Sequence, residues 1–309
     1  MSSKQNLIPI AGVLSGALVW GLIWYPYRVL QDAGISGALA TFITYALAML
    51  FGVFMLPRVW NELKLHKKTG AGWWTILLIF SAGWTNFGYV LAILHGEVMR
   101  VLLLFYLAPL WTILFAYWLL GERLNHYGYL VIALSFSGAF IMLWEPRLGL
   151  PLPTNFAEWI GLSAGMCFAL SNVVSRRAAH LSIEAKSYSV WLGTALLTAP
   201  FLGWQKDIPN QFPAIPFQAL LILVLIGIIL CATSFAVQYA LANLPANRAI
   251  ILFLFELVVA SVSSYFFADE AMQPRDWLGA LLIVSASLLS GKLPAQSKPE
   301  ATKPPCCCS

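Results

Sequence analysis

The chain has 309 residues, of which 60% are hydrophobic and only 10% are charged. An ordinary soluble domain carries about 25% charged residues, so this composition excludes a water-soluble globular protein. The formal net charge of +5 does not indicate nucleic-acid binding, because the basic residues lie in short connections between apolar segments. We therefore expect an all-α integral membrane protein whose surroundings are the lipid bilayer.

Ten apolar segments follow one another along the chain, and a helix needs about 20 residues to cross a bilayer. They cover residues 7–30, 36–57, 73–94, 97–119, 125–144, 157–177, 186–204, 216–242, 246–267 and 275–291. The connections between them are short, and one of them is an expected loop from Lys64 to Gly72. The pattern predicts ten transmembrane helices.

The distribution of Lys and Arg favours one orientation in the membrane. With the N-terminus in the cytoplasm, thirteen of the 18 basic residues fall on the cytoplasmic side and five on the outer side. Cytoplasmic loops carry such an excess, so we expect a multi-pass protein of the plasma (inner) membrane with both termini cytoplasmic. Residues 293–309, rich in Pro, Lys and Ser, are predicted to be a disordered cytoplasmic tail. Acylation of its three cysteines, Cys306 to Cys308, is the alternative role.

One register shift of 148 residues aligns the two halves of the chain. It pairs Arg28 with Arg176, Arg100 with Arg248, Glu122 with Glu270, and Phe105 with Phe253. Matched charges are informative in a chain with so few of them. We expect one five-helix repeat over residues 1–148 and a second over 149–292. Because five is odd, the second repeat enters the membrane inverted, as in many secondary transporters.

Several short motifs carry a resemblance to a known family. They are Val19-Trp20-Gly21, Leu107-Ala108-Pro109, Leu120-Gly121-Glu122-Arg123, Phe255-Glu256-Leu257 and Asp269-Glu270. Over about residues 7–291, the chain resembles the EamA-type, ten-helix branch of the drug/metabolite transporter superfamily. It departs from the family pattern at Leu257, where a Pro is usual, and in the second segment, which lacks an Arg that many relatives carry. The resemblance implies export of amino acids, purines or other metabolites, in some members coupled to protons.

Glu256 lies near the middle of the ninth apolar segment. A charged carboxylate at that depth costs at least ~2.5 kcal/mol, so such acids usually face the interior of the helix bundle. One interpretation makes Glu256 a binding site for a substrate amine or for a proton. The other is a neutral carboxyl group, hydrogen-bonded to a neighbouring helix.

Two further groups of side chains are candidate substrate contacts. Trp20 and Trp24 share one face of the first segment, and the counterpart of Trp24 in the second half is Asn172. The third and eighth segments carry a second group, formed by Trp84, Asn86, Tyr89, Gln238 and Tyr239. Aromatic and amide groups together suit a ligand that is partly apolar and partly zwitterionic. Placement of Trp24 in an interfacial aromatic belt, and amide pairing between helices, are the structural alternatives.

Four arginines form two matched pairs near the membrane surfaces. Arg28 and Arg100 are expected on the outer side, and Arg176 and Arg248 on the inner side. They are candidate gate elements or anion-attracting vestibules at the two mouths. The alternative is that their side chains reach to the interface without any transport role.

The sequence thus favours a secondary transporter that exports small metabolites by alternating access through a central cavity. Amino acids, aromatic or otherwise zwitterionic, are the expected substrates, and purines or phosphorylated metabolites are alternatives. A proton is a candidate coupling ion, and the protein is expected to be a monomer or a homodimer. No catalytic motif is found, so no enzyme activity, cofactor or metal is expected. A non-transporting scaffold would have a dry interface between its repeats, whereas a carrier would have a polar cavity bounded by segments one, three, six, eight and nine.

Overall fold

A computed structural model describes residues 4–68, 72–96, 98–144, 152–204, 215–267 and 273–290. Within these ranges the regular structure is helical throughout. The predicted tail at 293–309, its cysteines and the Asp269-Glu270 motif lie outside the described residues.

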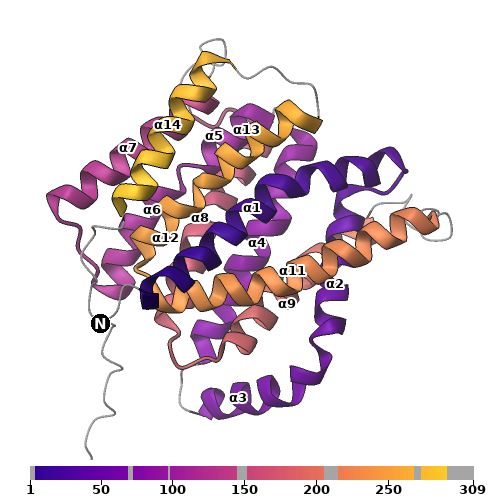
Figure 1. The fold of residues 1–309 in the computed structure, drawn as a ribbon. Coiled ribbons are helices and arrows are strands. Elements are labelled where there is room, and N and C mark those ends of the chain that lie inside the picture. Colours follow the sequence, from indigo (N-terminus) through magenta and orange to yellow (C-terminus); the bar gives the residue numbers. More distant parts are fainter. Residues whose placement is uncertain are drawn as a thin grey trace, which may run out of the picture.

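Helices occupy all ten segments that the sequence predicts (Figure 1). The first half contains α1 (Lys4–Asp32), α2 (Gly37–Phe51), the 3₁₀ turn η1 (Val53–Met55), α3 (Leu56–Lys68), α4 (Gly72–His95), α5 (Val98–Phe105), α6 (Ala108–Phe115), the π-helical turn η2 (Ala116–Leu120) and α7 (His126–Leu143). The second half contains α8 (Phe156–Arg177), α9 (Ile183–Trp204), α11 (Phe217–Asn243), α12 (Ala246–Phe253), α13 (Phe255–Phe267) and α14 (Pro274–Leu289).

Seven helical stretches of the described chain are long and apolar enough to cross a membrane. Two of them combine consecutive elements, namely 100–120 across α5, α6 and η2, and 246–267 across α12 and α13. An eighth would be α2 with residues 53–62, which is bent by 53°. The 22-residue α9 and the 16-residue α14 occupy the remaining two segments. The protein is therefore a multi-pass membrane protein with an all-helical fold.

The two halves repeat each other in register and in packing. The starting residues of α5 and α12, and those of α7 and α14, are 148 positions apart, as are the last residues of α4 and α11. The packing of α4 on α8 is matched by that of α11 on α1, and the packing of α4 on α9 by that of α11 on α2. The pairs α2–α9 and α7–α14 each join an element to its own counterpart. This arrangement is that of two inverted five-helix repeats.

The fourth and ninth predicted segments are each broken, whereas the sequence pattern suggested one helix for each. The first break falls at Tyr106 and the second at Leu254, again 148 residues apart. Pro109 contributes to the first break, because it has no N–H to donate to the Phe105 carbonyl. The second break has Leu257 at the equivalent place, so proline is not its cause. There the Leu257 N–H donates to the Leu254 carbonyl, a tighter turn than the α-helix makes.

The prediction of a loop from Lys64 to Gly72 was wrong for residues 64–68, because α3 continues to Lys68. The second segment also ends as α2 at Phe51 rather than as one helix to 57. Glu62 explains why α3 has a fixed position: its carboxylate accepts hydrogen bonds from the backbone N–H and the hydroxyl of Ser182, both at 2.6 Å. Because Ser182 immediately precedes α9, this contact ties α3 to the second repeat.

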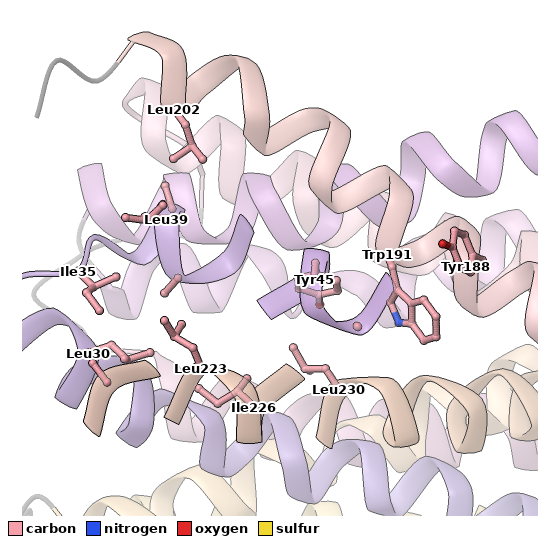
Figure 2. Close-up of a cluster of buried hydrophobic side chains, with 14 of the residues drawn as sticks. Leu30, Ile35, Leu39, Tyr45, Tyr188, Trp191, Leu202, Leu223, Ile226 and Leu230 are labelled. Atoms are coloured by element: carbon pink, nitrogen blue, oxygen red, sulfur yellow. The ribbon is translucent and has the colours of Figure 1, made fainter. Parts of the chain in front are cut away.

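The largest buried apolar cluster lies where α2, α9 and α11 meet (Figure 2). Trp191 of α9 is fully buried in it, and its indole N–H donates to the Ser234 hydroxyl of α11 at 2.9 Å. Leu30 and Ile35 bring the end of α1 and the following turn into the same cluster. The core of the protein therefore lies between the repeats and depends on both.

A buried ion pair joins the repeats at one end of the bundle. The Arg176 Nε donates to Glu122 Oε1 at 2.6 Å, and both side chains are about 95% buried. Arg176 also donates to the Leu244 carbonyl at the end of α11, and Glu122 accepts from the Ala246 N–H at the start of α12. The positive Arg176 thus binds a free carbonyl at the C-terminal end of one helix, and the negative Glu122 binds a free N–H at the N-terminal end of the next. Because Ile10 and Val13, in the first half of α1, belong to the same apolar cluster as Leu244, we call this end the N-terminal face.

A second ion pair joins the repeats at the opposite face. Arg100 of α5 binds the Glu158 carboxylate side-on, with Nε at 2.7 Å from Oε1 and Nη2 at 3.0 Å from Oε2. Its Nη2 also donates to the Leu152 carbonyl at 2.7 Å. Since Glu158 lies in the first turn of α8 and Arg176 in its last turn, α8 is held to the first repeat at both ends.

The backbones of α4 and α9 come close together at Gly83 and Gly193. A Cβ on Gly193 would meet the backbone carbonyl of Ile79 at a distance that no side chain tolerates. We expect Gly193→Leu to force the helices apart and to lower the free energy of unfolding by ~1–3 kcal/mol or more. Gly203→Leu in the same helix is the matched control, because nothing lies within 4 Å of its Cβ. Thermal unfolding of the two purified variants in detergent checks the prediction, and equal unfolding temperatures would refute it.

The Arg176–Glu122 pair gives a second prediction. Glu122→Gln leaves the Arg176 charge buried with a neutral partner, and we expect a loss of ~3–5 kcal/mol in the free energy of unfolding. The double variant Glu122→Gln, Arg176→Met removes both charges and is expected to be more stable than the single variant. A double variant that is less stable than Glu122→Gln would contradict this account.

Candidate functional site

A cavity lies between the two repeats in the centre of the bundle. It is lined by Trp20, Ala82, Thr85, Asn86, Tyr89, Phe105, Phe168, Ser171, Asn172, Val190, Val237, Gln238, Phe253 and Glu256. These residues come from α1, α4, α5, α8, α9, α11, α12 and α13, so all five segments expected to bound a carrier's cavity contribute. Its volume of about 100 Å³ accommodates several water molecules. Pockets for drug-sized ligands usually measure about 300–1,000 Å³, so a larger solute requires the cavity to widen.

An aromatic wall forms one side of the cavity. Phe168 stacks on Phe105, with ring centroids 5.5 Å apart, and meets Phe253 edge to face at 5.3 Å. Phe105 and Phe253 are repeat counterparts, and Phe168 is the counterpart of Trp20. The wall is therefore built from pseudo-symmetric pairs that lie on either side of the interface between the repeats.

Glu256 provides the cavity with an acidic group. It lies in the first turn of α13, directly after the break at Leu254. The Tyr106 and Tyr89 side chains both lie close enough to its carboxyl group to interact with it electrostatically. Tyr106 is the counterpart of Leu254, so this side chain comes from the equivalent break in the first repeat.

Amide side chains line another part of the cavity, and they differ in how they are bonded. Asn86 is engaged at both ends, accepting from the Tyr45 hydroxyl and donating to the Ala82 carbonyl. Gln238 accepts a hydrogen bond from Ser175. Asn172 is only 5% exposed, and its Nδ2 is buried without a hydrogen-bond partner in the described structure. A buried donor without an acceptor is costly, so Asn172 is the group best placed to bind a ligand oxygen.

Six of the nine predicted substrate contacts line the cavity, and three lie elsewhere. Trp24 donates its indole N–H to Ser263 of α13 at 2.9 Å, and Trp84 donates to Ser163 of α8 at the same distance. Tyr239 is 37% exposed and lines a separate groove between α1, α9 and α11. These three residues face neighbouring helices or the outer surface of the bundle.

The four predicted gate arginines occupy four different environments. Arg100 and Arg176 form the ion pairs described above. Arg28 is exposed at the end of α1. Arg248 is partly buried at the start of α12, and its Nε has no partner among the described residues. Pairs that match in sequence are therefore not matched in their contacts.

Several lining residues were not predicted, notably Phe105, Phe168 and Phe253. The register that pairs Phe105 with Phe253 was itself the available signal, because residues shared by inverted repeats gather around their interface. The small residues Ala82 and Ser171 give no sequence signal of their own. Among the described residues, no group of three or more His, Cys, Asp or Glu side chains is arranged to hold a metal ion.

Comparison with known proteins gives relatives along nearly the whole chain. The transporter YwfM of Bacillus subtilis, uncharacterized, is 25% identical over 290 residues, which cover 93% of this chain and 94% of the relative. The protein RarD of Streptomyces exfoliatus is 23% identical, covering 88% and 84% respectively. A solved crystal structure shares the fold with a TM-score of 0.71 at 18% identity, covering 94% of this chain and 97% of that one.

The sequence model of the EamA-like transporter family matches twice, at residues 7–144 and 155–291. The two matches together take in all ten helical segments except the first few residues of α1. The resemblance to the EamA branch of the drug/metabolite transporter superfamily is thus confirmed, and the chain belongs to the EamA-like transporter family.

Proposed function

We propose that the protein exports amino acids, aromatic or otherwise zwitterionic, through the cavity between its repeats. The observation that carries the proposal is the combination of the acid Glu256 with the Asn172 amide, a buried donor that has no partner among the described residues, in a cavity walled by aromatic rings. The substrate amine would bind the Glu256 carboxylate, and the substrate carboxylate would accept from the Asn172 amide. The side chain of the substrate would lie against Trp20 and the phenylalanine wall.

The charge of the lining argues against phosphorylated substrates. None of the described residues that line the cavity is Lys or Arg, and recognition of a phosphate group usually requires several cations. Purines are a second candidate class, because amides and aromatic rings also suit a flat heterocycle. Glu256 is in addition the candidate site for a coupled proton.

The inverted repeats support alternating access, in which the halves exchange conformations and open the cavity to one side and then the other. The two pseudo-equivalent helices α1 and α8 are held very differently. Residues buried inside the protein make up 67% of the membrane-crossing part of α8 but only 33% of that of α1. Ion pairs fix both ends of α8, and none is formed by α1 in the described structure. We infer that α1 moves during the cycle while α8 stays with the first repeat.

We further propose that the N-terminal face is cytoplasmic in the plasma (inner) membrane, since thirteen of the 18 basic residues would then lie inside. The Arg176–Glu122 pair would close the cavity toward the cytoplasm.

The transport proposal is tested in cells that lack their own amino-acid exporters and are loaded with dipeptides. We expect cells that produce the protein to release aromatic or other amino acids faster than cells with an empty vector. Release of purines instead would favour the second substrate class. If neither class leaves faster while the protein is present in the membrane, the exporter proposal fails.

The role of Glu256 is tested with Glu256→Gln, which keeps the shape and removes the charge. We expect transport of amino acids to fall by at least about tenfold, because a charge-assisted bond to the amine is lost. Trp84→Phe, outside the cavity, is the control and should transport at nearly the wild-type rate. Transport rates that do not vary between mildly acidic and mildly alkaline external pH would exclude proton coupling through Glu256.

Asn172→Ala gives a separate prediction about the carboxylate end of the substrate. We expect the KM for an amino acid to rise by about tenfold, and the KM for the corresponding decarboxylated amine to change little. An equal change for both compounds would show that Asn172 does not contact the carboxylate.

A further inference from the structure

Arg100 and Arg248 hold equivalent places in the two repeats. Each is the third residue of an eight-residue helix, α5 (Val98–Phe105) or α12 (Ala246–Phe253), and these helices begin and end 148 residues apart. Each helix packs against the first helix of the other repeat: α5 contacts α8, and α12 contacts α1. The surroundings of the two arginines can therefore be compared directly, because the arginines occupy equivalent positions in the two repeats.

At the first of these positions the arginine binds a carboxylate. Arg100 uses Nε and Nη2 to hold both oxygens of Glu158, at 2.7 and 3.0 Å. This side-on, two-point geometry matches the planar shape of a guanidinium group to that of a carboxylate. The Glu158 side chain is itself held by the N–H and hydroxyl of Thr154, so the carboxylate is fixed in place.

At the second position the residue equivalent to Glu158 is not an acid. The residue 148 positions before Glu158 is Ile10, in α1. Ile10 is partly buried and packs against the apolar cluster that contains Leu244 and Ala249, on both sides of Arg248 in the sequence. An apolar side chain at this place offers no hydrogen-bond acceptor to the arginine.

The arginine at the second position carries an unsatisfied donor. Arg248 Nε is buried without a hydrogen-bond partner in the described part of the chain, although the side chain is partly exposed. The neighbouring Asn247 is 3% exposed, and its Oδ1 likewise has no partner there. The Glu122 carboxylate, which accepts from the Ala246 N–H two residues before Arg248, is paired with Arg176 instead. Leaving a buried donor of a charged group without an acceptor costs free energy. This cost favours an acceptor from outside the chain.

We infer that Arg248 is a binding site for the carboxylate group of a small molecule at the N-terminal face. The ligand takes the place that Glu158 takes on Arg100. During transport this carboxylate is that of the substrate, bound before it reaches Asn172 and Glu256. The substrate as the source of the carboxylate rests on the proposed function, whereas the site itself does not, because a free carboxylate such as acetate has the same chemistry.

The site is tested without transport, by acetate binding to the purified full-length protein in detergent. Sodium acetate is titrated against sodium chloride at equal ionic strength, and the unfolding temperature is measured. We expect acetate to raise the unfolding temperature saturably, as a ligand of the native state does. Arg248→Gln should weaken the acetate affinity by at least about tenfold. Equal effects of acetate and chloride, or an unchanged acetate response in Arg248→Gln, would overturn the inference.

A tethered carboxylate provides a sharper test of the same geometry. Ile10→Glu places an acid where Glu158 stands in the other repeat, and it should abolish the acetate response by occupying Arg248. Ile10→Gln is the matched control and should keep the response, because it adds a similar side chain without a charge. A wild-type acetate response in Ile10→Glu would refute the inferred site. If Ile10→Glu does not fold, Arg248→Gln decides alone.

The source of the carboxylate is tested by transport. In proteoliposomes, Arg248→Gln should raise the KM for an amino acid applied at the N-terminal face and leave the KM for its decarboxylated amine unchanged. An equal effect on both would exclude the substrate carboxylate as the ligand. If no amino acid is transported by the wild-type protein, the proposed function fails, while the acetate measurements still decide whether the site exists.

Discussion

The buried pair of Arg176 and Glu122 determines how the two repeats meet at the N-terminal face. Two charges away from water are stable only when their remaining donors and acceptors are also satisfied. Here Arg176 also binds the carbonyl that ends α11, and Glu122 accepts the N–H that begins α12. The pair therefore fixes the turn between α11 and α12 together with the end of α8. From this turn α12 leads to the break at Leu254 and places Glu256 at the cavity.

The breaks in the fourth and ninth segments are the second constraint on the site. Without them, Tyr106 and Leu254 would continue regular helices, and the Tyr106 and Glu256 side chains would not lie close enough to interact. Non-helical backbone at membrane depth is tolerated only where it is buried in protein or lines a cavity, and both conditions are met here. The aromatic wall covers the same region, since Phe105 and Phe253 each directly precede a break.

Sequence reasoning predicted the ten helical segments and the register because both depend on long, repeated patterns. It did not predict α3 (Leu56–Lys68), because no membrane-spanning pattern covers that helix and its Glu62 contacts the distant Ser182. It placed Trp20 and Glu256 at the cavity but also Trp24, Trp84 and Tyr239, which lie elsewhere. In lipid, polar and aromatic groups are found both in cavities and between helices. Whether such a side chain lines a cavity or lies between helices depends on whether a neighbouring helix offers a hydrogen-bond partner, as Ser263 does for Trp24 and Ser163 for Trp84. No local sequence pattern indicates that partner.

Departures from the repeat, more than the repeat itself, account for the chemistry of the protein. Symmetric pairs such as Phe105 and Phe253 supply the wall, but the acid Glu256 has Ala108 as its counterpart, and the free donor Asn172 has Trp24. Two identical halves would place two acids or none in a cavity on their pseudo-symmetry axis. A single acid facing neutral amides can orient a substrate that has two unlike ends. The replacement of Glu158 by Ile10 follows the same logic at the surface, because it removes a partner from one arginine of a pair and leaves that arginine available to a ligand.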